Sequence, residues 1–233
     1  MKVSQRGAIP RFIVMEVMKA AAEREAAGES VLHMEVGQPS TRAPQGVVDA
    51  AKQALDDDLL GYTLTMGFDG LRARIAQHYQ DFYGLVVPEE RICVTTGSSA
   101  AFLLTFLAAF DPGDKVAILR PGYPCYRNIM GALDIEAVEI PVGPESRFQP
   151  TLKMLEAAGG AELDGLLIAS PANPTGSMLR EDELKQILDY CRENQIRYIS
   201  DEIYHGITYG DEVASAAAFD DNAVIINSFS KYF

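Results

Sequence analysis

Six short runs of apolar and β-branched residues recur from residue 92 onward, and longer helical patterns separate most of them. Several runs are almost continuously apolar, which is typical of strands that are covered on both faces. Alternation of strands and helices at this spacing predicts βαβ units and a mainly parallel sheet. We therefore expect an α/β fold with three layers, α/β/α. The predicted strands are Ile92–Thr96, Lys115–Leu119, Glu136–Ile140, Gly165–Ala169, Arg197–Ser200 and Ala223–Asn227.

Helical spacing of apolar residues predicts the other regular elements. The region before the first strand is predicted to be mainly helical, apart from a short extended stretch at Val31–Val36. Gly28 suits the end of the first helix, and Pro44 suits the start of the second. The predicted helices are Ile9–Ala27, Pro44–Leu55, Asp69–Phe82, Ser99–Phe110, Thr151–Ala158 and Glu181–Asn194.

The composition limits the partners of the chain. Its 233 residues are 48% hydrophobic, enough to bury a substantial core. A net charge of −13 and a pI near 4.6 disfavour nucleic acid and anionic membrane as partners. The first residues lack the continuous apolar core of a signal peptide, and Ala100–Phe110 is too short to span a bilayer. Three widely spaced cysteines, Cys93, Cys125 and Cys191, suit a reducing compartment, which we take to be the cytoplasm, and give no metal-site spacing.

A ligand site is expected just after the predicted strands, because open α/β sheets bind ligands beyond the carboxyl ends of their strands. The segment Thr96-Gly97-Ser98-Ser99 follows the first run and opens a helix. Its glycine lets the backbone approach a ligand, its serines supply hydroxyls, and the helix start supplies free N–H groups to an anion. The segment is a candidate phosphate site, although a serine N-cap without a ligand has the same pattern. Nucleotide-binding motifs are absent.

Three further strand ends carry polar or aromatic residues. Residues 120–126 could place an aromatic ring over a planar ligand, or could form an ordinary Pro-Gly turn with a packed tyrosine. Residues 170–176 contain two prolines, which predict a rigid turn carrying Asn173, and we expect the peptide bond after Asn173 to be cis. A carboxylate at Asp201 is costly to bury unless a positive group meets it, and a protonated pyridine nitrogen would serve. The alternative is that Asp201 is an N-cap or forms a salt bridge within the protein.

The last run is followed by Ser228 and, three residues later, Lys231. The serine could complete a phosphate site, and the lysine could form an imine (Schiff base) with an aldehyde. Ser-x-x-Lys also occurs in serine hydrolases, but the companion motifs Ser-Asp-Asn and Lys-Thr-Gly are missing here.

Together these segments resemble the class I/II aminotransferases, the pyridoxal-phosphate (PLP) enzymes of fold type I. The resemblance covers essentially the whole chain, and its motifs stand in the family order. They are Val36-Gly37-Gln38-Pro39, Gly61-Tyr62-Thr63 with Gly67, Thr96-Gly97-Ser98-Ser99, Pro121-Gly122-Tyr123-Pro124, Asn173-Pro174-Thr175-Gly176, Asp201-Glu202-Ile203-Tyr204 and Ser228-Phe229-Ser230-Lys231.

The resemblance implies catalytic roles. Lys231 is similar to the lysine that holds the aldehyde of PLP and then moves a proton from the substrate's α-carbon. Asp201 resembles the partner of the pyridinium nitrogen, which keeps the ring an electron sink. Asn173 and Tyr204 resemble the groups that bond the phenolic oxygen, and Tyr123 resembles the residue that stacks on the ring.

Other implied roles concern the phosphate, the substrate and a second subunit. Gly37 resembles the glycine whose backbone meets the substrate carboxylate. Tyr62 is similar to a tyrosine that reaches the phosphate of the neighbouring subunit, which implies a homodimer. The implied activity is transfer of an amino group between an L-amino acid and a 2-keto acid. The expected phosphate-binding residues are Gly97, Ser98, Ser99 and Ser228.

The resemblance also implies a domain division. Residues 1–43 correspond to the N-terminal segment of the family's small domain, and residues 44–233 to its PLP-binding large domain. Family chains continue well beyond the lysine, with an antiparallel strand and an arginine that clamps the substrate carboxylate. We therefore expect a large domain that is incomplete at its C-terminus, and a 233-residue chain that is inactive by itself.

Three alternatives stay open at this point. The first is a non-catalytic fragment or interaction partner with the same fold. The second is a Ser-x-x-Lys hydrolase with Ser228 as its nucleophile. The third is an acyl-transfer or β-lyase variant of the same cofactor fold. The preferred substrate side chain cannot be read from the sequence.

Overall fold

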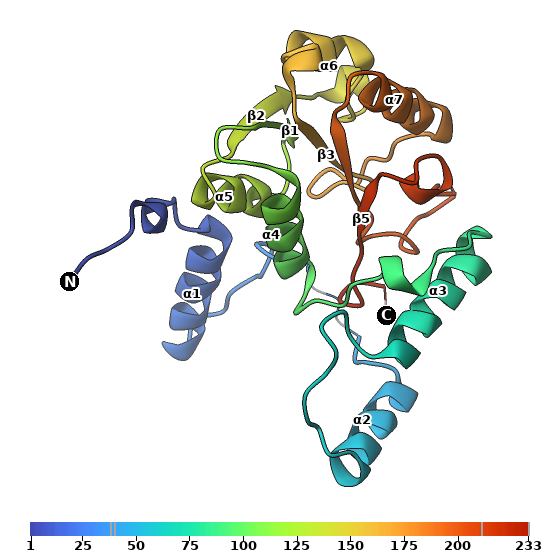
Figure 1. The fold of residues 1–233 in the computed structure, drawn as a ribbon. Helices are drawn as coiled ribbons and strands as arrows, with labels where there is room; N and C mark the ends of the chain where they lie inside the picture. Colours follow the sequence, from blue (N-terminus) through green and yellow to red (C-terminus); the bar gives the residue numbers. More distant parts are fainter. Residues whose placement is uncertain (38, 40, 211, 233) are drawn as a thin grey trace.

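A parallel sheet forms the centre of the molecule (Figure 1). The computed structural model describes residues 1–37, 39, 41–210 and 212–232; Gln38, from the first family motif, and Phe233, the last residue of the predicted large domain, lie outside them. The strands lie in the order β2-β1-β3-β4-β5 and every pair is parallel. All but the first of the predicted runs are thereby confirmed as strands. They are β1 (Lys115–Arg120), β2 (Glu136–Pro141), β3 (Gly165–Ala169), β4 (Arg197–Asp201) and β5 (Val224–Ile226).

The predicted helices are confirmed, with ends that shift by a few residues. The largest shift is at the first helix, which begins at Ile13 because Ile9, before Pro10, is extended, with ψ at 147°. One helix, α5, was not predicted. The helices are α1 (Ile13–Ala26), α2 (Gln45–Asp57), α3 (Asp69–Tyr83), α4 (Ser98–Ala109), α5 (Pro124–Ala132), α6 (Leu152–Ala157) and α7 (Glu181–Glu193), with short 3₁₀ turns at Gln5–Ala8, Glu89–Arg91, Pro144–Ser146, Gly160–Glu162 and Ala216–Ala218.

Two apolar clusters cover the two faces of the sheet, because successive side chains of a strand point to opposite faces. Leu166 of β3 packs in one cluster with Leu155 of α6 and Ile187 of α7. Leu167, the next residue of β3, packs in the other cluster with Phe106 of α4 and neighbouring residues of α5. The three-layer α/β/α fold is therefore confirmed (Figure 1).

The prediction of a strand at Ile92–Thr96 is wrong. This segment is irregular and leads from the 3₁₀ turn at Glu89–Arg91 into α4. An extended run becomes a strand only where a neighbouring strand shares its hydrogen bonds. The N–H of Val94 instead donates to the carbonyl of Met66, in the turn before α3, at 3.0 Å. The predicted stretch at Val31–Val36 likewise belongs to none of the described strands.

The strand order fixes where a site can form. The chain leaves β1 toward β2 on one side and leaves β3 toward β4 on the other side. Ligands bind at such a switch point, beyond the carboxyl ends of the two strands. The N-terminal segment reaches the same region from outside the sheet, beside α5 (Figure 1), where the ring of Phe12 packs edge-on against Tyr123 at 6.0 Å between centroids.

Candidate active site

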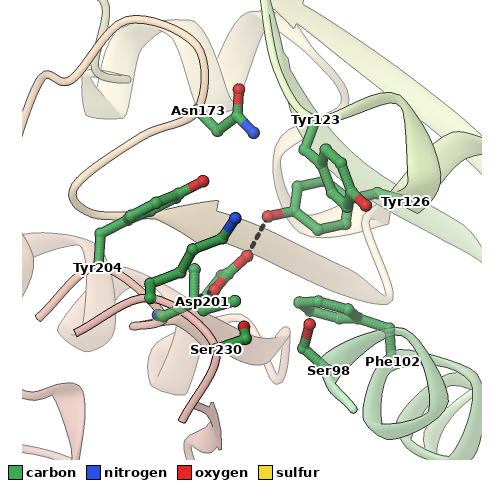
Figure 2. A pocket seen from close by; sticks show the side chains of 10 residues that line it. Ser98, Phe102, Tyr123, Tyr126, Asn173, Asp201, Tyr204 and Ser230 are labelled. Carbon is green, nitrogen blue, oxygen red and sulfur yellow. Dashed lines mark hydrogen bonds between the residues drawn. The ribbon is translucent and has the colours of Figure 1, made fainter. Parts of the chain in front are cut away.

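A cavity of about 210 Å³, here called the small cavity, lies where the loops after β1, β3 and β4 meet the start of α4 (Figure 2). Residues predicted from separate segments of the sequence, from Ser98 to Lys231, are neighbours in its wall. Phe102, Tyr126 and Ser230 also line the cavity and are not among the predicted site residues. The lining residues are Ser98, Phe102, Tyr123, Tyr126, Asn173, Asp201, Ile203, Tyr204, Ser230 and Lys231.

Asp201 brings a buried carboxylate to the small cavity from the end of β4, with 4% of the residue exposed. One oxygen accepts a hydrogen bond from the backbone N–H of Ile203 at 3.1 Å, and the other accepts one from the hydroxyl of Tyr126. Burial raises the pKa of Asp201 to about 6, although both hydrogen bonds lower it. A cation that entered the cavity beside this carboxylate would favour its ionised form.

Tyr126 is a site residue that sequence reasoning missed. Pro124 starts helix α5, so Tyr126 lies one turn past Tyr123 and on a related side. Its buried ring packs edge-on against Phe102 and Tyr123, with centroids 4.9 and 5.4 Å away. Burial first, and then the charge of Asp201, raise the pKa of Tyr126, so it stays a neutral donor to that carboxylate. The three-residue spacing of Tyr123 and Tyr126 could have indicated that both face one site, but the proline and glycine of this segment favour a turn over a helix.

Asn173 and Tyr204 place two neutral polar groups in the cavity wall, as Figure 2 shows. Burial, and then the charge of Asp201, raise the pKa of Tyr204, while a hydrogen bond with Asn173 lowers it. The peptide bond between Asn173 and Pro174 is cis, as predicted. The bonds before Pro121 and Pro171 are also cis.

Lys231 lines the small cavity. Its Nζ donates to the backbone carbonyl of Gly37 at 3.3 Å and lies 6.0 Å from the centre of the Tyr204 ring. The predicted lysine and the predicted substrate-binding glycine are therefore in contact.

A second cavity of about 740 Å³, the large cavity, adjoins the small one and shares Tyr123, Asn173, Tyr204 and Lys231 with it. Most of its wall is apolar, and Glu35 is its acidic residue. Its lining includes Phe12, Val14, Met15, Val36, Met178 and Ile207 as well as Gly37.

The start of helix α4 provides free backbone donors. Gly97, at the N-cap, has φ 92° and ψ 166°, and no side chain caps the helix. The first N–H groups of such a helix lack partners within the helix and can bind an anion. Ser98 lines the small cavity, whereas Gly97, Ser99 and Ser228 do not. Ser228 nevertheless donates from its hydroxyl to Ser230, at 2.9 Å, and Ser230 does line the cavity.

Tyr62 does not lie in either cavity. It is fully exposed in the segment between α2 and α3, where Leu59 is also exposed. Its expected contact concerns a second subunit and stays a prediction.

The hydrolase alternative has no support from the local backbone. Ser228 precedes a turn that carries Lys231, rather than standing at the start of a helix that carries the lysine. Residues three apart share a face only on a helix, where the lysine amine can reach the serine hydroxyl, and Ser228 lacks this arrangement.

The small cavity fits the chemistry of PLP. Asp201 offers a carboxylate to a protonated ring nitrogen, and Lys231 offers an amine to the aldehyde. The helix start beside Ser98 offers donors to a phosphate. Among the described residues, no cluster of histidine, cysteine, aspartate or glutamate could hold a metal ion, and no helix is long and apolar enough to cross a membrane.

Comparisons with known proteins agree with this arrangement. Residues 29–233 match the family described as aminotransferase class I and II. The chain is 47% identical to a valine–pyruvate aminotransferase from Mycobacterium tuberculosis, over 100% of this chain and 60% of that protein. It is similar to the crystal structure of an aminotransferase from Mycobacterium tuberculosis, with a TM-score of 0.95 and 47% identity, over 100% of this chain and 60% of the other.

A more distant structure has the same fold. The aspartate aminotransferase from Thermus thermophilus with maleate matches with a TM-score of 0.94 and 27% identity, over 99% of this chain and 61% of that chain. The chain thus spans about 60% of the length of these relatives. From its match over residues 29–233, the chain belongs to the class I and II aminotransferase family.

Proposed function

We propose that the protein is a PLP-dependent aminotransferase that moves an amino group between an L-amino acid and a 2-keto acid. The observation that carries this proposal is the convergence of an amine, a buried carboxylate and a free helix start on one cavity, from Lys231, Asp201 and α4. When bound there, PLP supplies an electron sink for the negative charge that develops at the substrate's α-carbon. Family membership supports the same reading.

The residues predicted from the family resemblance would then hold the cofactor as follows. Lys231 would bond to the aldehyde carbon, and Asp201 would accept a hydrogen bond from the ring nitrogen and balance its charge. Tyr204 and Asn173 would bond the phenolic oxygen, and Tyr123 would cover one face of the ring. The phosphate would be bound at the start of α4 by the segment Gly97-Ser98-Ser99, with Ser228 beside it.

Lys231 also has a task in proton transfer. Once the amino group of the substrate has replaced it, its freed Nζ would take the proton from the substrate's α-carbon. Contact with the Gly37 carbonyl holds Nζ near the boundary of the two cavities. The backbone of Gly37 would meet the substrate's carboxylate on the same side.

We infer that the amino donor has an apolar side chain. The large cavity beside Lys231 is lined mainly by apolar residues, among them Val14, Met15 and Ile207. Lys231 is the only cationic residue among the described residues of this wall, and Glu35, paired with His33 at 2.7 Å, offers an anionic side chain no attraction. The name of the valine–pyruvate relative supports this choice.

We further propose that the protein is a homodimer in which Tyr62 reaches the phosphate of the partner subunit. Exposed apolar side chains support an interface there, because monomers rarely expose large contiguous apolar patches. Besides Tyr62, the exposed large apolar residues on α2 and the segment after it are Val47, Leu55, Leu59, Leu60, Leu64, Met66 and Phe68.

Two further proposals concern organisation and compartment. Residues 1–43 form part of a small domain, and residues 44–233 form a large domain; the position of α1 beside α5, outside the sheet layers, supports this division (Figure 1). The free state of Cys93, Cys125 and Cys191 supports a reducing compartment such as the cytoplasm.

Covalent labelling tests the function. The protein is incubated with PLP, its absorbance is recorded, and the adduct is reduced with borohydride and located by peptide mapping. We expect the pyridoxyl group on Lys231 and no stable adduct in Lys231→Ala. Label on Lys185 or Lys115 in place of Lys231 would overturn the assignment.

A further inference from the structure

A buried histidine lies behind the small cavity and is not used by the proposed chemistry. His205 follows β4, and 6% of the residue is exposed. Its ring meets three elements of the fold. Nε2 lies 2.9 Å from the backbone carbonyl of Ser170, and Nδ1 lies 2.7 Å from the hydroxyl of Tyr83 at the end of α3. Nδ1 is also 3.6 Å from a carboxyl oxygen of Glu202.

The partners of the ring fix its protonation. A backbone carbonyl can only accept a hydrogen bond, so Nε2 carries the proton and donates to Ser170. In a neutral ring the other nitrogen then accepts, and the hydroxyl of Tyr83 donates to it. Burial lowers the pKa of His205 to about 4, so the neutral ring is the form present near pH 7.

Glu202, the carboxyl beside the ring, is 1% exposed. One oxygen accepts from the N–H of Ala216 at 2.9 Å, and the oxygen that faces His205 has no hydrogen-bond partner within the described residues. Burial raises the pKa of Glu202 to about 7. A proton held by Glu202 removes the negative charge that would otherwise favour a charged imidazole beside it.

Ser170 is the point at which the loop of residues 170–176 leaves β3. Its N–H donates to the carbonyl of Asp201 at 3.2 Å, as an extension of the strand pair, and its carbonyl accepts from His205. Three residues further on, the same loop presents Asn173 to the small cavity. The orientation of the Ser170 carbonyl therefore sets the direction in which the loop starts.

We propose that His205 is a positioning residue for the small cavity, and that its Nε2–H bond to Ser170 ties the loop carrying Asn173 to the Tyr83 end of α3. The ring thus links the loop after β3 to helix α3, and no backbone hydrogen bond among the described residues joins Ser170 directly to Tyr83. The expected effect on cofactor binding rests on the proposed function, whereas the link between Ser170 and Tyr83 through His205 does not depend on it.

Two substitutions separate the ends of this bridge. His205→Gln places an amide N–H near the position of Nε2 and can keep the bond to Ser170. His205→Asn places an amide oxygen near the position of Nδ1, and it can accept from Tyr83 but is too short to reach Ser170. Both remove the ring and leave a polar side chain, so each serves as the control for the other.

The first measurement is amide hydrogen exchange in residues 170–176 of the cofactor-free protein. We expect exchange about tenfold faster in His205→Asn and close to that of the unmodified protein in His205→Gln. We expect the dissociation constant for PLP, from an absorbance titration, to rise about tenfold in the asparagine variant only. Equal exchange in both variants would overturn the proposal.

A second measurement needs no substitution. The chain has three histidines, so nitrogen-15 NMR can assign each ring. We expect His205 to be neutral and protonated at Nε2 from pH 5.5 to 8, and a ring protonated at Nδ1 or charged at pH 7 would contradict the bridge. If the unmodified protein binds no PLP, the proposed function fails, while the exchange and NMR results still decide the role of His205.

Discussion

Asp201 and Glu202 are adjacent buried carboxyls whose surroundings differ. Consecutive residues at a strand end point to opposite faces, so Asp201 meets Tyr126 and the small cavity, while Glu202 meets Ala216 and His205. Asp201 faces the small cavity, where we propose that a cationic ring nitrogen binds, and Glu202 is enclosed by protein. Burial raises the pKa of both, and of the two only Asp201 lines the small cavity.

Removing the carboxyl of Asp201 should separate binding from turnover. In Asp201→Ala, PLP is expected to bind through its other contacts, but the ring loses the charge that keeps its nitrogen protonated. In a form that spans the full length of its relatives, we expect the half-reaction rate, measured in single turnovers with an amino donor, to fall by roughly a hundredfold or more. Asp201→Glu, which keeps the carboxylate, is the matched control. Near-normal half-reaction rates in the alanine variant would assign Asp201 another role.

Glu202 should make stability depend on pH in a definite direction. Its pKa rises from 4.5 to about 7 on folding, so the folded state binds the proton more tightly. The stabilisation from this difference is fully present below pH 4.5 and is lost as the pH rises through 7. We expect the free energy of unfolding of the unmodified protein, relative to that of Glu202→Gln, to fall between pH 4.5 and 7. Denaturant unfolding of both proteins at several pH values measures this difference. A difference that grows with pH would show that Glu202 is ionised and paired in the folded state.

At the scale of elements, the five strands could be predicted from their apolar composition, but the same criterion wrongly predicted a strand at Ile92–Thr96. The buried strands β1, β3 and β4 are apolar because helices cover both faces, and this pattern is local to each run. Pairing is not local, so Ile92–Thr96 has strand-like composition without a strand partner. Helix α5 was missed because its proline and glycine neighbours indicate a turn, although proline suits the first turn of a helix.

The same distinction applies to the candidate site. Residues at strand ends, such as Asp201, were predictable because parallel strands bring their carboxyl ends together. Tyr126 and Phe102 were missed because they reach the cavity from helix faces that pack against the sheet. Their place depends on how α4 and α5 pack; the spacing of Tyr123 and Tyr126 points to the second tyrosine, whereas no short pattern reports Phe102.

We expect glycine to be the only residue that fits the N-cap of α4, position 97, without backbone strain. Gly97 has φ 92°, and a Cβ there would meet nothing within 4 Å, so a side chain would strain the backbone without a clash. We expect Gly97→Ala to lower the free energy of unfolding by about 1–3 kcal/mol. We also expect it to weaken PLP binding, because the first N–H groups of α4 turn away from the cavity.

A matched control is available in the loop before β1. Gly113 also has positive φ, 96°, and open space around it, but it lies away from the cavity. Gly113→Ala is expected to cost stability and leave PLP affinity unchanged. Equal losses of affinity in the two variants would mean that strain, and not the helix start, governs binding.

At the scale of the molecule, the exposed apolar segment around Tyr62 should be an interface. We expect the unmodified protein to sediment as a dimer and Leu59→Asp to weaken the dimer by at least about tenfold, because a charge would be buried against apolar side chains. Loss of the dimer should also lower PLP affinity if Tyr62 acts across the interface. Val86→Asp is the control, since Val86 is exposed beyond α3. A dimer unaffected by Leu59→Asp would place the interface elsewhere.

The contact between Lys231 and Gly37 joins residues that lie 194 positions apart in the sequence. Contacts of such long range form late in folding, since the chain between them must be ordered before they become favourable. The two sides of the proposed reaction centre should therefore meet only after the sheet has assembled. During refolding, PLP binding should recover later than the far-ultraviolet circular dichroism signal of the helices. A partly folded chain should therefore be unable to bind the cofactor.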